Sequence, residues 1–198
     1  MIGWRLYLGG TVAKPNRSML AAIGEVANES ARVDEQLREV FTLLIESPYG
    51  EVISAGEDTG RLVQLCLRVA GFNRRVPDEA VEFLRTICQY IDQVRLDRNF
   101  LIHSVWEKVP DSKEHVGIRS KRPATSGRTE TSEAFRWTLE QALDTAEAYR
   151  LVSQSLGQFI DGVFPGERKP RVISRHRWAE MTDAMNKLSA LLMPPAAP

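Results

Sequence analysis

Cysteine is scarce in this chain of 198 residues, and its two cysteines follow no recognisable pattern. Neither Cys66 nor Cys88 lies near a second cysteine or a histidine at the spacing of metal ligands. This argues against a zinc site and against the disulfide framework of small secreted proteins. We therefore expect a reducing compartment, no metal and no cofactor.

Net charge and long apolar runs are also missing. The 26 Lys and Arg residues balance 26 Asp and Glu residues, so any nucleic acid or anionic membrane would have to be bound by a local patch. No segment approaches the run of about 18 apolar residues that a membrane span needs. The first ten residues, MIGWRLYLGG, have no apolar stretch long enough for a signal peptide. These absences predict a cytoplasmic protein without a membrane partner.

Helical patterns occupy most of the chain. From a cap at Asn16, apolar residues alternate spacings of three and four from Ile23 to Leu44, until Ser47 and Pro48 break the pattern. A second, shorter helix is predicted over about 59–70. A third begins with Pro77 as its first helical residue and continues past position 100. We expect an all-α fold.

The pattern changes between positions 109 and 131, where turn signals flank a short alternating stretch around Val116 and Ile118. We expect a small β-hairpin or loop here, followed by another long helix that starts from a cap at Thr131 or Ser132. The predicted organisation is an N-terminal arm (1–15), a helical domain (16–165) and a C-terminal part (166–198) with a linker, a last helix and a disordered tail. The last helix, 174–192, has an apolar seam that we expect to pack at or beside a dimer interface.

The third helix contains the stretch DRNFLIHSVWE, in which polar residues interrupt an apolar pattern. At roughly 100° per residue, Arg98 falls in the centre of the apolar stripe. A guanidinium is costly to bury unless a polar partner, a wet cavity or an interface meets it. Asn99 and His103 lie one turn apart and face the same way. The apolar stripe comprises Leu84, Ile87, Ile91, Val94, Leu101, Ile102 and Val105.

Arg98, Asn99 and His103 resemble the short motif of the HEPN (higher eukaryotes and prokaryotes nucleotide-binding) superfamily. In that motif an arginine and a polar residue, often asparagine, precede a histidine, with four to six residues between the arginine and the histidine. The match also includes the placement of the motif late in a long helix, followed by a hairpin-like loop and another long helix. The resemblance covers roughly residues 17–163.

The resemblance implies a helical bundle that forms a homodimer around the motif helix, and an endoribonuclease that needs no metal. His103 would move the proton of the 2′-hydroxyl or of the leaving oxygen, and Arg98 would stabilise charge on the phosphoryl group. Asn99 would orient the phosphate or His103. For RNA binding we single out Arg95, Lys121 and Arg122.

Other basic residues near the motif are further candidates for phosphate contacts, although such runs are also typical of solvated loops. Those in the loop after the motif helix are Lys113, Arg119 and Arg128, and those in the later linker are Arg168, Lys169, Arg171, Arg175 and Arg177. Trp106 is a candidate for stacking on a base, but a core role fits a tryptophan at this position better.

Three hypotheses therefore stand. The first is a ribonuclease of the toxin or host-defence kind, with RNA as substrate and a cognate antitoxin or regulator as partner. The second is a catalytically inactive HEPN-like module that binds nucleotides or proteins. The third is an unrelated helical scaffold in which His103 is a hydrogen-bonded structural residue and Arg98 pairs with a glutamate of the first helix.

Overall fold

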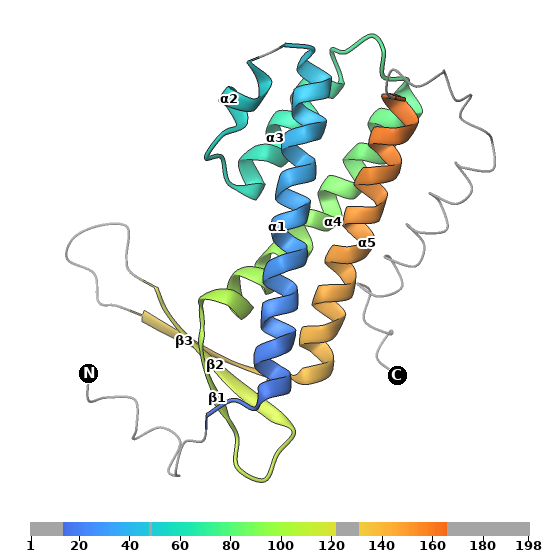
Figure 1. Ribbon diagram of the computed structural model, residues 1–198. Helices are drawn as coiled ribbons and strands as arrows, with labels where there is room; N and C mark the ends of the chain where they lie inside the picture. Colours follow the sequence, from blue (N-terminus) through green and yellow to red (C-terminus); the bar gives the residue numbers. More distant parts are fainter. Residues whose placement is uncertain (1–13, 48, 122–130, 166–198) are drawn as a thin grey trace, which may run out of the picture.

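Three long helices run side by side through the computed structural model, with two shorter helices at one end and a small sheet at the other (Figure 1). The structure describes residues 14–47, 49–121 and 131–165. The predicted arm, the last helix, Arg122, Arg128 and the later basic linker lie outside these residues. The elements are α1 (Arg17–Ile45), α2 (Gly50–Ser54), α3 (Thr59–Ala70), α4 (Asp78–His103), β1 (Val105–Lys108), β2 (Glu114–Lys121), β3 (Thr131–Thr138) and α5 (Leu139–Val163).

The first helix begins where its cap predicts. The Asn16 side-chain oxygen accepts a hydrogen bond from the Met19 amide at 2.8 Å, which satisfies one of the amides that a helix start leaves unpaired. At the other end Glu46 has φ 50°, in the left-handed region. The Asn73 side-chain amide donates to the Leu44 carbonyl at 2.7 Å. The predicted cap and the predicted end of α1 are both confirmed.

The next helices agree with the sequence pattern in extent but differ at their ends. The predicted helix over 59–70 is confirmed and is capped by Asp58, whose side chain accepts from the Arg61 amide at 2.9 Å. Pro77 is the residue before α4 rather than its first helical residue. The prediction that Val105 continues the helical stripe is wrong, because the backbone becomes extended at Ser104 and Val105 begins β1 with 69% of its surface exposed.

The insertion after the motif helix is a three-stranded antiparallel sheet of order β1-β2-β3, not a hairpin alone. Residues 131–138 were expected to open the long helix after the hairpin, and this is wrong: they form β3, whose Trp137 pairs with His115 of β2. The helix α5 starts after Thr138. The Thr138 hydroxyl accepts from the Gln141 amide, and the Gln141 side chain accepts from the Thr138 amide, which forms a capping box.

Two apolar clusters form the interior. The helical core lies where α1, α3, α4 and α5 meet, and the sheet-end core lies between the sheet, the start of α1, the end of α4 and the start of α5. The largest fully buried side chains of the helical core are Leu37, Phe41, Leu44, Leu62, Leu84, Ile87, Ile91, Tyr149, Leu156 and Phe159. The buried members of the sheet-end core are Met19, Ala22, Val26, Phe100, Leu101, Trp106, Ala142 and Ala146.

A polar position separates these two clusters on α1. Val26 belongs to the sheet-end core and Val33 to the helical core, and between them Ser30 is buried with 2% of its surface exposed. The described chain is thus mostly helical, as predicted, with one sheet added. None of the helices in the described ranges is both long and apolar enough to cross a lipid bilayer.

Candidate functional site

The motif lies at the C-terminal end of α4, partly on a face that no other described element covers. Asp92, Leu96, Asn99 and His103 recur at spacings of four, three and four, so they share one face of the helix. Leu96 is 68% exposed, His103 is exposed and Asn99 is half-buried. Two of the three motif residues therefore lie on a surface with an exposed leucine beside them.

Arg98 reaches this surface from the interior. It is half-buried, its Nε donates to the Ser30 hydroxyl at 3.3 Å, and its Nη1 donates to the Asn99 side-chain oxygen at 2.8 Å. The Ser30 hydroxyl in turn donates to the Ala27 carbonyl at 3.0 Å. The polar partner that the sequence analysis requires for this guanidinium is thus the buried serine between the two apolar clusters.

Tyr149 of α5 interacts electrostatically with the same guanidinium. Burial raises the pKa of the Tyr149 hydroxyl well above its ordinary value, and the positive charge of Arg98 acts in the opposite direction. Tyr149 is 1% exposed. Arg98 is therefore bonded to α1 through Ser30 and interacts electrostatically with Tyr149 of α5, while its Nη1 atom joins the motif surface through Asn99.

His103 is the last residue of α4, and in the described part of the chain no hydrogen bond or ion pair joins it to Arg98 or Asn99. It is exposed and not sealed in an apolar core. The structure thus joins Arg98 to Asn99 directly and places His103 one helical turn beyond Asn99 on the same face.

The sheet holds the end of the motif helix through Phe100, which follows Asn99. The Phe100 ring lies 5.8 Å from Trp106, 4.4 Å from Phe135 and 6.3 Å from Trp137 between ring centroids. Trp106 is 7% exposed, and its indole N–H donates to the Leu101 carbonyl at 2.8 Å. Trp106 therefore belongs to the core and is not available for stacking on a base.

Among the basic residues named for RNA or phosphate contacts, Arg95 and Arg119 have described side chains that pair with carboxylates. Arg95 is half-buried, pairs with Asp92 at 3.3 Å and passes so close to Gly60 of α3 that a Cβ there would lie 2.9 Å from Arg95 Nη1. Arg119 pairs with Glu133 at 3.1 Å and lies over the Phe100 ring at 5.7 Å. The Lys121 side chain lies outside the described atoms.

Neither a reactive cysteine nor a metal site is found in the described residues. Cys66 and Cys88 are both free and buried. Burial raises the pKa of the Cys66 thiol to about 12, which removes the reactive thiolate at neutral pH. No group of three or more His, Cys, Asp or Glu side chains in the described ranges is arranged to hold a metal ion.

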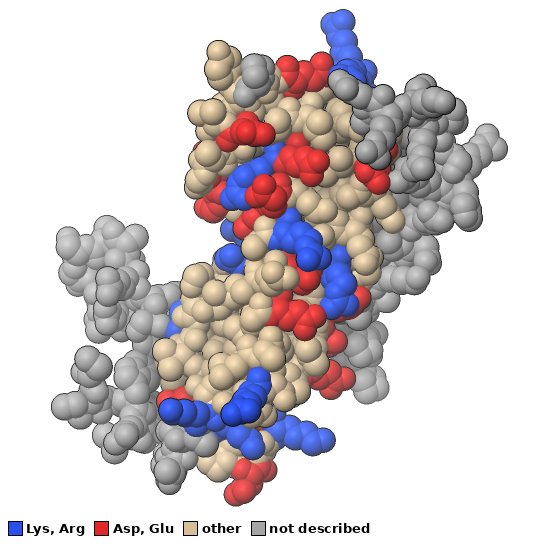
Figure 2. Space-filling model, viewed as in Figure 1, with Lys and Arg blue, Asp and Glu red and all other residues tan. Residues whose placement is uncertain are grey.

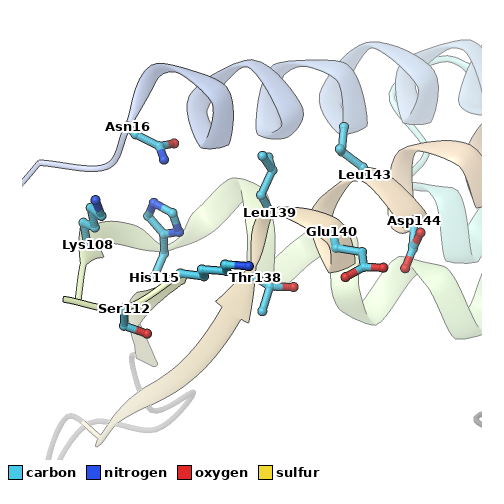
Figure 3. A pocket seen from close by; sticks show the side chains of 10 residues that line it. Asn16, Lys108, Ser112, His115, Thr138, Leu139, Glu140, Leu143 and Asp144 are labelled. Carbon is cyan, nitrogen blue, oxygen red and sulfur yellow. The ribbon is translucent and has the colours of Figure 1, made fainter. Parts of the chain in front are cut away.

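A second candidate site, which the sequence analysis missed, lies around His115. This histidine lines a cavity of about 580 Å³ between the sheet and the first turns of α1 and α5 (Figure 3). The sequence around it shows only an alternating strand pattern, and the lining residues come from separate parts of the chain. Only the folded arrangement brings these residues together.

Comparison with known proteins adds no assignment, since no protein-family model, no curated protein and no solved structure matches the chain. The motif and the geometry of its residues therefore carry the functional interpretation.

Proposed function

We propose that the protein is a metal-independent endoribonuclease of the HEPN type, with Arg98, Asn99 and His103 as its site residues. The observation that carries this proposal is the 2.8 Å hydrogen bond from Arg98 to Asn99 on the helix face that ends in the exposed His103. Arg98 thus brings a permanent positive charge to Asn99, one helical turn before the exposed His103, and neither Arg98 nor His103 is fully buried.

The chemistry follows from the residue types. The 2′-hydroxyl oxygen of a ribose attacks the adjacent phosphorus, and the bond from phosphorus to the 5′ oxygen of the next nucleotide breaks. His103 accepts the hydroxyl proton, or donates a proton to the leaving oxygen in a second protonation state. The remaining N–H groups of Arg98 stabilise the charge on the phosphoryl oxygens. The products are a 2′,3′-cyclic phosphate and a 5′-hydroxyl end.

A second copy of the chain would complete this site. One α4 face supplies a single histidine, whereas cleavage uses both a proton acceptor and a proton donor. Leu96 lies on the same face as Asn99 and His103 and is 68% exposed, so a partner chain at this face would bury it. We propose a homodimer in which two α4 faces meet and the RNA backbone lies between them.

An RNA cleavage assay in the presence of EDTA tests this activity. His103→Ala should lower the cleavage rate by about 10²–10⁴-fold, because general acid–base catalysis contributes about that much. Gln89→Ala is the matched control, since it changes an exposed polar residue on α4 about 21 Å along the helix from His103. Equal rates for the wild type and His103→Ala, or activity that EDTA abolishes, would contradict the proposal.

One observation favours the catalytically inactive module as a second candidate. Arg98 already donates to both Ser30 and Asn99, so the guanidinium has a structural role without any substrate. A non-catalytic module predicts that the wild-type chain binds RNA or nucleotides without cleaving them. Product analysis after prolonged incubation with a short RNA separates the two: a 2′,3′-cyclic phosphate end supports the enzyme, and intact bound RNA supports the module.

The biological setting belongs to the same proposal. A ribonuclease of the toxin or host-defence kind must be held inactive in its own cell, so a cognate antitoxin or regulator would cover the α4 face. Such a partner would have to contact Leu96, Asn99 or His103 on that face.

A further inference from the structure

The cavity around His115 is separate from the motif surface. It lies between the sheet and the first turns of α1 and α5, and it shares no lining residue with the Arg98, Asn99 and His103 site. Its volume of about 580 Å³ falls within the range of small-molecule sites in proteins. A ligand bound in this cavity would therefore be independent of the proposed ribonuclease site.

His115 is the unusual residue of this cavity. Its side chain is 1% exposed, yet neither ring nitrogen has a hydrogen-bond partner in the described part of the chain. Buried polar atoms are nearly always paired, because an unpaired one loses its bonds to water without replacement. Figure 3 shows the imidazole directed toward the Asn16 end of the cavity. An occupant of this end would supply the missing partner.

The charged residues of the lining are separated along the cavity. Lys108 and His115 lie at the end near Asn16, whereas Glu140 and Asp144 lie on α5 at the other end (Figure 3). Leu139 lies between the two groups and gives the middle of the cavity an apolar wall. A ligand that matches this lining has an anionic end and, several atoms away, groups that donate hydrogen bonds.

The basic end is suited to a phosphate group. Lys113 also lines the cavity, so the lining has two ammonium groups and an imidazole that bind anions. The N-terminal ends of α1 and α5, at Asn16 and Thr138, add their partial positive charge. On the face shown in Figure 2, Lys and Arg side chains gather at the end that contains the sheet, whereas both signs are interspersed along the helices.

We propose that this cavity binds a small phosphate monoester, such as a phosphorylated sugar. The phosphate lies against Lys108, Lys113 and His115, and hydroxyl or amino groups of the ligand donate to Glu140 and Asp144. The phosphate accepts a hydrogen bond from a His115 ring N–H, which gives the buried imidazole its partner.

Binding is coupled to the protonation of His115. Burial, and then the charge of Lys108, lowers the pKa of His115, so the empty cavity favours the neutral ring. A dianion beside the ring favours the charged form and raises this pKa. The charged groups that line the cavity are Lys108 and Lys113, from β1 and the β1–β2 turn, and Glu140 and Asp144, from α5; Asn16, the cap of α1, is uncharged.

NMR titration of the full chain tests the proposal, with the ring proton signals of His115 as readout and His115→Gln to identify them. The probes are inorganic phosphate, ribose 5-phosphate and ribose. Both phosphates should shift the His115 signal and raise its titration midpoint, ribose 5-phosphate should bind about tenfold more tightly than inorganic phosphate, and ribose should not bind. No shift of His115 with either phosphate, or an equal shift with ribose, would overturn the proposal.

Two variants that each remove one positive charge distinguish a specific phosphate site from general electrostatic attraction. Lys113→Gln should weaken ribose 5-phosphate binding by about tenfold, whereas Lys14→Gln, which removes the same charge outside the lining, should have little effect. Both lysines are exposed, so neither variant depends on the tolerance of the core. Equal weakening by the two variants would refute a specific phosphate site.

A substitution of Asp144 tests the acidic end of the cavity. Asp144→Asn should reduce the preference for ribose 5-phosphate over inorganic phosphate and leave the affinity for inorganic phosphate unchanged. An unchanged preference would refute the role of α5 in recognising the sugar.

Discussion

Arg98 and His103 belong to one sequence motif, but the structure gives them different physical roles. Arg98 is half-buried and bonded to a serine that is 2% exposed, whereas His103 is exposed at the end of α4. Removing Arg98 therefore removes the hydrogen-bond donor of both the Ser30 hydroxyl and the Asn99 side-chain oxygen. Removing the His103 side chain disturbs no hydrogen bond that the structure describes.

This difference predicts separate effects on stability. Arg98→Ala should lower the free energy of unfolding by about 1–3 kcal/mol, since it removes hydrogen bonds to a charged group. His103→Ala should change the same free energy by less than about 0.5 kcal/mol, as is usual for an exposed side chain. Urea denaturation of both variants measures these values. A loss with His103→Ala as large as with Arg98→Ala would mean that the histidine is structural.

His115 predicts a pH dependence of stability. Its pKa is near 6.5 in the unfolded chain and lower in the folded one, so the unfolded state binds more protons between these two values. The contribution of this residue to stability is therefore complete above about pH 6.5 and is lost as the pH falls toward the folded-state value. The wild type should lose more stability than His115→Gln between about pH 7.5 and about pH 5.5.

Denaturation in phosphate-free buffer at both pH values checks this difference, because the carboxylates titrate alike in the two proteins. Parallel losses of stability in the wild type and His115→Gln would show that His115 is not the group responsible. Because a bound phosphate favours the charged ring, adding phosphate should reduce the wild type's extra loss at the lower pH.

The sheet fixes the end of α4, and it does so through a close contact at Gly117 of β2. A Cβ at this position would lie 2.8 Å from Trp106 Cη2 and 2.9 Å from Phe100 Cε1. Glycine therefore allows the two rings to cover the strand, and Phe100 carries this contact to the motif helix. The sheet is thus part of what positions Asn99 and His103.

Gly117→Ala tests the importance of this contact. The added methyl group must displace two rings of the sheet-end core, so we expect a loss of about 1–3 kcal/mol in the free energy of unfolding. Gly24→Ala is the matched control, because nothing lies within 4 Å of a Cβ at this helical position. There the same change should stabilise α1 by about 0.5–1 kcal/mol. If both variants had the same stability, the contact at Gly117 would have no energetic weight.

The proposed site requires two chains to assemble into a homodimer. Light scattering should show a homodimer at micromolar concentration, and Leu96→Glu should convert it to a monomer by placing a charge on the α4 face. Leu20→Glu is the control, since Leu20 is 53% exposed on α1 and outside the motif face. A monomeric wild type would contradict the composite site, and equal effects of the two variants would move the interface elsewhere.

Local patterns in the sequence predict most of the helices. Capping residues and apolar spacings of three and four predict the cap at Asn16, the helix over 59–70 and the long helix that contains the motif. The same reasoning identifies Arg98 as a residue that needs a polar partner. These features depend on residues at most a few turns apart, so they can be predicted without a fold.

Residues 131–138 and the cavity around His115 could not be predicted in this way. Phe135 and Leu139 are spaced as in a helix, but the pairing of β3 with β2 and the contact of Phe135 with Phe100 make 131–138 a strand. Ser30 as the partner of Arg98, and Glu140 and Asp144 opposite His115, are likewise brought together from distant parts of the chain. Contacts of this kind depend on how helices and strands pack, because the free energy of burial is shared among residues that no local pattern connects.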